Sequence, residues 1–169
     1  MSQMQYRQLG AGGSTIPILM FGAWPIGGEM GAVEEDQANQ TIRHALDLGV
    51  TAIDTADGYR SSESVIGKAI SGRRDEVFLA TKVTRGSYNR ARLQEAIANS
   101  LRALQTDHVD LYQPHSYPQG VSLEEAMEAL AEVRESGKAR YIGVSNFTVD
   151  QLSAATRLYK LRTAVGKAI

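Results

Sequence analysis

Four side chains with complementary acid–base chemistry follow successive apolar segments of the chain. In IDTADGY, Asp54 ends one segment and Tyr59 comes shortly after it, while Lys82 in FLATKV and His115 in LYQPHS end the next two. A phenol is a weak acid with an ordinary pKa of about 10, and a neighbouring ammonium favours the phenolate and lowers that pKa. A carboxylate keeps the lysine charged, and an imidazole can donate to a carbonyl oxygen. Together the four groups would form a proton donor for a carbonyl that receives hydride.

Each of these residues also has a structural interpretation when it is taken alone. A strand-end aspartate fits a cap or turn residue, and a loop tyrosine fits a half-buried aromatic. Lys82 fits a solvated strand end, and His115 fits a hydrogen-bonded structural histidine. Their occurrence at successive segment ends favours one shared site. No side chain supplies hydride, so this chemistry requires a cofactor.

The elements that must position these residues alternate regularly along the chain. We expect a small hairpin from residues 5–9 and 16–17, followed by strands at 18–21, 51–53, 77–81, 109–113 and 139–144. Apolar residues at helical spacing, with glycine or N-cap signals at the ends, predict helices at 36–48, 62–71, 89–104 and 122–136, and another that begins near 148–150. No linker or low-complexity tract interrupts them. The pattern predicts one domain over residues 1–169.

Strands that alternate with helices indicate βαβ units and a parallel sheet. The polar landmarks lie roughly 30 residues apart, which is the size of one such unit. Residues at the carboxyl ends of strands face one common mouth in the (β/α)₈ barrel. A doubly wound Rossmann sheet would carry G-x-G-x-x-G at its first helix, and GAWPIGGEMG lacks that motif. We therefore predict an α/β fold of the (β/α)₈ TIM barrel type, incomplete, with about five βα units after the hairpin.

Composition excludes several classes of function. The chain has 18 Lys plus Arg against 19 Asp plus Glu, so no basic field would attract nucleic acid or an anionic membrane. It has no cysteine, which excludes disulfides and thiolate sites. Its three histidines, His44, His108 and His115, are isolated from one another, so we expect no metal. Without a signal-like or membrane-spanning apolar stretch, we expect a cytoplasmic protein.

Several segments resemble the aldo-keto reductase family. GVTAIDTADGYRSSESVIGKAI resembles the family's signature around its catalytic Asp and Tyr, and FLATKV and DLYQPHS resemble the strands that bear its Lys and His. GKARYIGVSNF is similar to the segment that ends in the Ser-Asn pair binding the nicotinamide carboxamide, and YRQLGAGGSTIPILMFGAWPIGG is similar to the N-terminal hairpin and first strand. The resemblance spans roughly residues 5–155.

The resemblance implies an NADP(H)-dependent oxidoreductase that reduces aldehydes or ketones to alcohols. It implies that Tyr59 is the general acid, that Lys82 and Asp54 tune it, and that His115 orients the substrate carbonyl. The residues implied to contact the cofactor are Gly22, Ala23, Trp24, Asp54, Ser145 and Asn146. The implied partner is a small carbonyl compound.

The sequence departs from the family pattern in three places. Arg60 follows Tyr59 where many members have glycine, and we expect it to point to solvent. Pro114 precedes His115 and removes one amide donor, which the end of a strand tolerates. The family barrel requires eight strands and about 250 residues, whereas the sequence has 169. From this length we expect a truncated form that is weakly active or inactive, with unpaired edges on the first and fifth strands.

Two other functions remain open at this point. One is a non-catalytic relative that binds nucleotide and regulates a partner such as a potassium channel, because such a protein can retain the same four residues. The other is an aldolase or isomerase that uses Lys82 as a Schiff-base amine.

Overall fold

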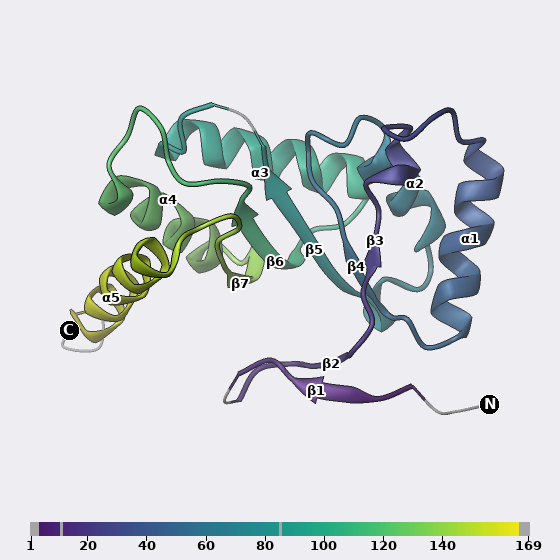
Figure 1. Cartoon of the computed structure of the whole chain (residues 1–169), viewed down its shortest axis with the longest axis horizontal. Coiled ribbons are helices and arrows are strands. Elements are labelled where there is room, and N and C mark those ends of the chain that lie inside the picture. Colours follow the sequence, from purple (N-terminus) through teal and green to yellow (C-terminus); the bar gives the residue numbers. More distant parts are fainter. Residues whose placement is uncertain (1–3, 11, 85, 166–169) are drawn as a thin grey trace.

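Five strands form one parallel sheet in the computed structural model of the chain, which describes residues 4–10, 12–84 and 86–165. In spatial order, which is also sequence order, these strands are β3 (Phe21–Gly22), β4 (Ala52–Asp54), β5 (Phe78–Val83), β6 (Val109–Pro114) and β7 (Ala139–Ile142). Every neighbouring pair is parallel, and Lys82 of β5 lies opposite Gln113 of β6. The carboxyl ends of the strands therefore share one edge of the sheet, at the top of Figure 1. This confirms the predicted parallel α/β arrangement.

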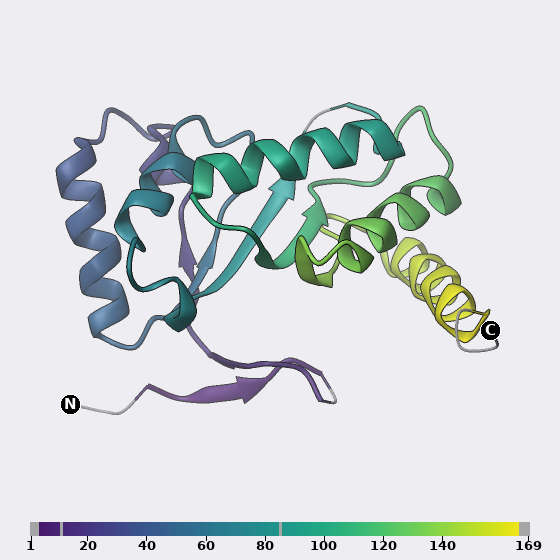
Figure 2. The same cartoon turned by 180° about the vertical axis from the view of Figure 1, so that it is seen from behind.

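A helix follows each strand of the sheet, as predicted. They are α1 (Glu35–Asp47), α2 (Ser62–Ala69), α3 (Arg90–Leu104), α4 (Leu123–Glu135) and α5 (Val149–Val165). Figure 2 shows α1 to α4 together on one side of the sheet. Asn89 and Ser122 are N-caps, because their side chains accept from the amides of Arg92 and Glu125. The predicted helices at 89–104 and 122–136 therefore begin one residue too early.

Two short 3-10 helices were not predicted from the sequence. They are η1 (Pro25–Gly27), in the connection between β3 and α1, and η2 (Arg74–Glu76), just before β5. Each is a single turn, too short to give a periodic apolar pattern. Both nevertheless contribute to tertiary contacts: Gly27 of η1 approaches the backbone of Tyr59, and Arg74 of η2 donates to Asp110.

The N-terminal hairpin lies beneath the amino ends of the strands, as the lower part of Figure 1 shows. Its strands β1 (Tyr6–Gln8) and β2 (Thr15–Pro17) are antiparallel, which confirms the prediction, although Ala11 in the connection lies outside the described residues. The hydroxyl of Tyr141 on β7 accepts from the amide of Ser14 at 3.0 Å and lies 3.1 Å from its hydroxyl. This contact joins the hairpin to the fifth strand of the sheet.

The prediction of a strand at 18–21 is wrong except at its last residue. The amide of Ile18 still donates to Gln5 of the hairpin at 2.9 Å, and the side chains of residues 18–20 are exposed. Parallel pairing begins only where Phe21 meets Ile53. Apolar residue type alone predicted a strand here, and it does not reveal that residues 18–20 still belong to the connection from the hairpin.

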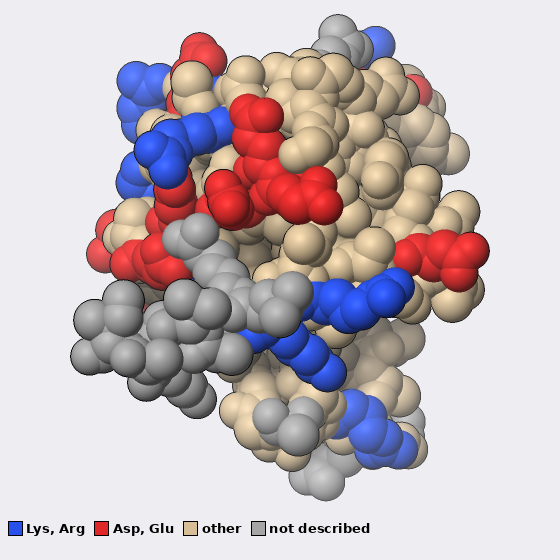
Figure 3. Space-filling view, turned by 90° about the vertical axis from the view of Figure 1, so that its left-hand side faces the viewer, with Lys and Arg blue, Asp and Glu red and all other residues tan. Residues whose placement is uncertain are grey.

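The apolar core fills the space between the sheet and its helices. Its fully buried side chains include Ile42, Ile66, Leu79, Leu93 and Leu130. Truncation of a buried leucine or isoleucine to alanine typically costs about 2–5 kcal/mol, so this layer holds the strands in register. None of the helices in the described part of the chain is long and apolar enough to cross a membrane. Side chains of both charges lie on the end of the molecule near α4 and α5 (Figure 3).

Candidate active site

An ion pair between β4 and β5 forms the base of the candidate site. Asp54 ends β4 and Lys82 lies one residue before the end of β5, so neighbouring parallel strands bring both to the same edge. The Lys82 ammonium donates to Asp54 Oδ2 at 2.6 Å and to the carbonyl oxygen of Thr55 at 2.8 Å. Its side chain is 8% exposed, whereas that of Asp54 is 30% exposed. The cation is therefore held in a fixed place while its carboxylate stays accessible.

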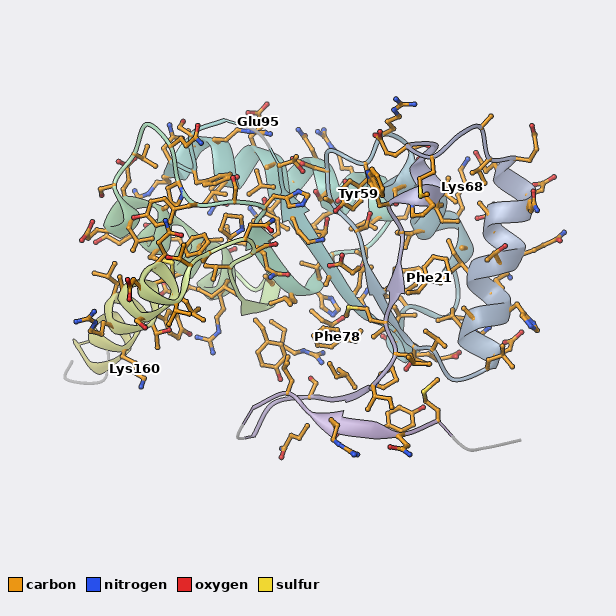
Figure 4. All side chains as sticks on the ribbon, in the orientation of Figure 1. Phe21, Tyr59, Lys68, Phe78, Glu95 and Lys160 are labelled. Carbon is orange, nitrogen blue, oxygen red and sulfur yellow. The ribbon has the colours of Figure 1, made fainter. Side chains whose placement is uncertain are left out.

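Tyr59 lies above this pair, in the loop after β4, as its label near the carboxyl ends of the strands shows in Figure 4. Its ring centroid is 5.4 Å from Lys82 Nζ, within the range of a cation–π contact. Its hydroxyl lies 3.4 Å from His115 Nε2, and the two rings meet edge to face with centroids 5.6 Å apart. The four residues predicted from separate segments thus meet at one place.

The electrostatic environment of Tyr59 differs from the sequence-based prediction. Burial raises the pKa of Tyr59 above its ordinary value, and the Asp54 carboxylate raises that pKa further. The predicted lowering by the ammonium is wrong, because Lys82 faces the ring and gives its hydrogen bonds to Asp54 and Thr55. Tyr59 is therefore a protonated phenol at neutral pH, which is the form that a proton donor needs.

The imidazole of His115 is neutral at neutral pH for related reasons. Burial lowers the pKa of His115, and the Lys82 ammonium lowers that pKa further, while the carboxylates of Asp54 and Asp57 act in the opposite direction. A neutral imidazole carries one hydrogen and can donate it to an oxygen. The backbone of His115 is fixed as well, since its amide donates to Val83 at 2.9 Å.

The predicted carboxamide-binding pair lies next to His115. The Asn146 side-chain amide donates to the carbonyl oxygen of His115 at 2.7 Å and to the hydroxyl of Ser145 at 3.2 Å. Asn146 has a φ of 56°, in the left-handed region that asparagine tolerates better than most residues. The segment after β7 therefore brings the Asn146 side chain to the backbone of His115 and the Ser145 hydroxyl next to Asn146.

The three predicted residues after the first strand lie in different environments. Gly22 is exposed and pairs with Asp54 in the sheet, and Trp24 is 48% exposed. Ala23 is fully buried, its amide donates to Asp54 at 2.9 Å, and its carbonyl accepts from the Ser62 hydroxyl at 2.9 Å. Ala23 therefore anchors the backbone at the end of β4, whereas Gly22 and Trp24 are open to a ligand.

The Arg60 side chain is 66% exposed, as expected, but it also has partners at the surface. Its guanidinium lies 3.2 Å from Glu29 Oε1 and donates to the carbonyl oxygen of Gly28 at 3.3 Å. Its backbone has a φ of 45°, which explains why glycine suits this position. Arg60 therefore links the loop that carries Tyr59 to the loop after β3. Pro114 ends β6 opposite Val83, so the strand tolerates it as expected.

Sequence reasoning missed the residues that hold the two loops in place. A Cβ at Gly27 would lie 2.1 Å from the carbonyl oxygen of Tyr59, and a Cβ at Gly58 would lie 2.7 Å from the side chain of Thr84. Thr84 in turn has its hydroxyl 3.3 Å from His115 Nδ1. The only available signal was the presence of glycine in loops, and that does not reveal which atom each glycine approaches.

The donor set at this edge suits a nicotinamide and a carbonyl group. The hydroxyl of Ser145 and the amide of Asn146 offer both donors and acceptors, as a carboxamide requires, and they adjoin His115. The phenol of Tyr59 and Nε2 of His115 are close enough for one oxygen to contact both. Among the described residues, no group of three or more His, Cys, Asp or Glu side chains is arranged to hold a metal ion.

Comparison with known proteins identifies relatives over nearly the whole chain. Residues 18–166 match the Aldo/keto reductase family. The chain is 42% identical over 173 residues to the aldo-keto reductase YhdN of Bacillus subtilis (strain 168), which covers 95% of the chain and 52% of that protein. It thus spans about half the length of the curated relatives that it matches.

Solved structures of similar proteins have the same fold. The thermostable aldo-keto reductase Tm1743, solved in complex with the inhibitor epalrestat, superimposes with a TM-score of 0.85 at 39% identity, over 92% of this chain and 58% of that one. An aldo-keto reductase from Klebsiella pneumoniae in complex with NADPH superimposes with a TM-score of 0.81 at 34% identity, over 93% of this chain and 54% of that one. The five strands therefore correspond to part of a barrel of this family, which confirms the predicted fold class.

Proposed function

Because the chain belongs to the aldo/keto reductase family, we propose that it acts in the NADP(H)-dependent reduction of small aldehydes or ketones to alcohols. The proposal depends on one observation: the Tyr59 hydroxyl lies 3.4 Å from His115 Nε2, and its ring faces the buried ammonium of Lys82, which is paired with Asp54. This is a proton donor beside a neutral hydrogen-bond donor and a fixed positive charge. Such a set suits an oxygen that gains negative charge during a reaction.

In this proposal each residue acts on the carbonyl oxygen of the substrate. The Nε2–H of His115 and the hydroxyl of Tyr59 donate to that oxygen and orient it. NADPH supplies the hydride that the carbonyl carbon accepts. As charge develops on the oxygen, Tyr59 transfers its proton to it, and the phenolate that forms lies near the ammonium of Lys82, whose Nζ is 5.4 Å from the ring centroid. Asp54 keeps Lys82 in place, because the buried ammonium requires a charged partner in addition to the carbonyl oxygen of Thr55.

We assign the cofactor contacts to the residues at the same edge of the sheet. Ser145 and Asn146 suit the carboxamide of nicotinamide, because together they present a donor and an acceptor beside His115. Gly22, at the end of β3, and Trp24, just after it, have exposed surface. A similar reductase from Klebsiella pneumoniae was solved with NADPH bound, which supports NADPH as the reductant to test first.

The decisive assay follows NADPH oxidation with a small aldehyde, in the chain and in two tyrosine variants. Tyr59→Phe removes only the proton donor, and general acids contribute about 10²–10⁴-fold, so we expect a loss of that size. Tyr6→Phe, on the exposed hairpin, is the matched control and keeps the parental rate. Equal rates for Tyr59→Phe and the parent would overturn the proposal. The expected weak activity of this chain stays a prediction that the same assay tests.

Binding separates the remaining alternatives from this proposal. The chain has one tryptophan, Trp24, whose fluorescence we expect to change when NADPH binds nearby. Binding without turnover would favour a non-catalytic nucleotide-binding relative. Trapping of a carbonyl compound on Lys82 with borohydride would favour Schiff-base chemistry, although Lys82 already donates to Asp54 and Thr55.

A further inference from the structure

The two ring nitrogens of His115 face different partners, and the proposed reaction needs the hydrogen on one of them. Nε2 lies 3.4 Å from the hydroxyl of Tyr59, and Nδ1 lies 3.3 Å from the hydroxyl of Thr84. A neutral imidazole has a hydrogen on only one nitrogen, and the hydrogen bond at the other nitrogen selects which. The group that contacts Nδ1 therefore decides whether Nε2 can donate to a substrate oxygen.

The second contact of Thr84 determines the direction of this hydrogen bond. The backbone amide of Gly58 donates to Thr84 Oγ1 at 3.1 Å, and an amide can only donate. The Thr84 hydroxyl hydrogen is then left for His115 Nδ1, the other partner recorded for this hydroxyl. If Nδ1 carried the hydrogen, the hydroxyl would receive two donors and its own hydrogen would have no partner among the described residues. The satisfied arrangement places the imidazole hydrogen on Nε2.

Thr84 is held in this position from two sides. Its backbone amide donates to Asp57 Oδ1 at 2.8 Å, and Asp57 Oδ2 lies 3.4 Å from the guanidinium of Arg92. Gly58 packs directly on its side chain, because a Cβ there would lie 2.7 Å from both Thr84 Oγ1 and Cγ2. A β-branched side chain has few rotamers, so the hydroxyl has little freedom to turn away.

We propose that Thr84 is a positioning residue of this site, whose hydroxyl donates to His115 Nδ1 and thereby keeps the imidazole hydrogen on Nε2. The inference rests on the proposed function for its purpose, since Nε2–H is the group that would orient a carbonyl oxygen. Thr84 does not touch the reacting atoms; it acts through His115. Thr84 comes directly after β5, two residues after Lys82, so one short stretch of chain provides both the buried cation and the group that orients the imidazole.

Nitrogen-15 NMR of the histidine rings tests this assignment directly on the full chain without any turnover. The chain has three histidines, and the signal of His115 is identified by its loss in His115→Gln. We expect the unsubstituted chain to show a protonated Nε2 and an unprotonated Nδ1 at neutral pH. In Thr84→Val the ratio of the two tautomers should shift towards Nδ1–H by about 2- to 12-fold, the range of one neutral hydrogen bond.

Two further variants separate this role from a general effect on packing. Thr84→Ser keeps the hydroxyl and should restore the parental tautomer ratio, and Thr41→Val removes a hydroxyl on the exposed face of α1 and should leave it unchanged. Gly58→Ala, whose added methyl would push Thr84 away, should shift the ratio as Thr84→Val does. A protonated Nδ1 in the unsubstituted chain, or an unchanged ratio in Thr84→Val, would overturn the proposal.

The turnover assay then distinguishes a failure of this inference from a failure of the proposed function. If the function holds, kcat of Thr84→Val with NADPH and a small aldehyde should fall by about 2- to 12-fold, and Thr84→Ser should recover it. If the tautomer shifts as expected but no form oxidises NADPH, the proposed reductase activity fails and the structural role of Thr84 stands. If turnover is present and falls in Thr84→Val with an unchanged tautomer ratio, the inference fails and the function stands.

Discussion

Two carboxylates, one buried and one partly exposed, lie at opposite ends of the parallel sheet, and they are satisfied in different ways. At the amino end, Asp110 of β6 is only 4% exposed in its side chain. Its Oδ2 accepts from Arg74 at 3.0 Å and from the amide of Leu79 at 2.9 Å, and its Oδ1 lies 3.2 Å from Arg140. Arg74 also donates to backbone carbonyls before β5 and β6. Both oxygens of this carboxylate therefore have cationic partners.

At the carboxyl end, Asp54 has a single cationic partner among the residues that the structure describes. Lys82 donates to Asp54 Oδ2 at 2.6 Å, and the side chain of Asp54 remains 30% exposed. The partner cation faces the ring of Tyr59 instead of a second carboxylate. The two carboxylates thus differ in accessibility, although each forms an ion pair with a neighbouring strand, Asp54 with β5 and Asp110 with β7. We call Asp110 with Arg74 and Arg140 the saturated pair, and Asp54 with Lys82 the open pair. The saturated pair suits a structural role, and the open pair suits a role in chemistry.

The sharpest test of this comparison removes one charge from each carboxylate. Asp110→Asn leaves two arginines near a neutral amide in a buried setting, and breaking a buried pair costs about 3–5 kcal/mol. Asp54→Asn leaves Lys82 with Thr55 and a partly solvated amide, and we expect a loss of about 1–3 kcal/mol. Urea unfolding of both variants gives the two values. Equal losses would contradict the distinction between a saturated and an open pair.

Sequence reasoning predicted the open pair and missed the saturated one. Asp54 and Lys82 stand at the ends of apolar segments, and strand alternation places them at one edge of the sheet. Asp110 has no such signal, because its partners come from η2 and β7, and η2 is too short to show a pattern. The sequence also did not predict that the pKa of Tyr59 is raised. That shift depends on burial, which follows from packing between distant loops.

The next largest effect concerns the backbone contact that supports Tyr59. Gly27→Ala places a methyl group 2.1 Å from the carbonyl oxygen of Tyr59, so η1 or the loop must move. Overpacking of this kind costs about 1–3 kcal/mol. Gly22→Ala is the control, because a Cβ there meets no atom within 4 Å. Urea unfolding should give a lower free energy of unfolding for Gly27→Ala than for Gly22→Ala. Equal values would mean that the loops at the carboxyl end of the sheet can shift to accept the added methyl group.

A third carboxyl group, Glu63 on α2, extends the comparison to a buried acid that forms no ion pair with a cation in the described part of the chain. Burial raises the pKa of Glu63 above its ordinary value of 4.5, and the Thr81 hydroxyl, which donates to it at 2.6 Å, acts against that rise. As pH rises above 4.5, the unfolded chain loses this proton before the folded chain does, so folding stability falls.

Glu63→Gln should remove this part of the pH dependence while keeping an acceptor for Thr81. Relative to the parent, the variant should gain stability as pH rises from acid to neutral values, which thermal melts at several pH values measure. Glu95→Gln, on the exposed face of α3 and labelled in Figure 4, is the control and should follow the parent. If Glu63→Gln follows the parent as well, Glu63 is ionised in the folded chain and a cation must approach it.

The smallest expected effect lies at the amino end, where the hairpin meets β7. Tyr141→Phe removes the acceptor of the Ser14 amide and the partner of its hydroxyl but keeps the stacking on Phe78, with ring centroids 6.4 Å apart. We expect a loss of about 0.5–1.5 kcal/mol, confined to the hairpin. Hydrogen exchange should then accelerate at the amide of Leu9, which donates to Ser14 within the hairpin. The amide of Leu79, bound to Asp110, should keep its protection because the saturated carboxylate is untouched. Faster exchange at both amides would mean that the hairpin and the Asp110 cluster open together, so that the amino end is one cooperative unit.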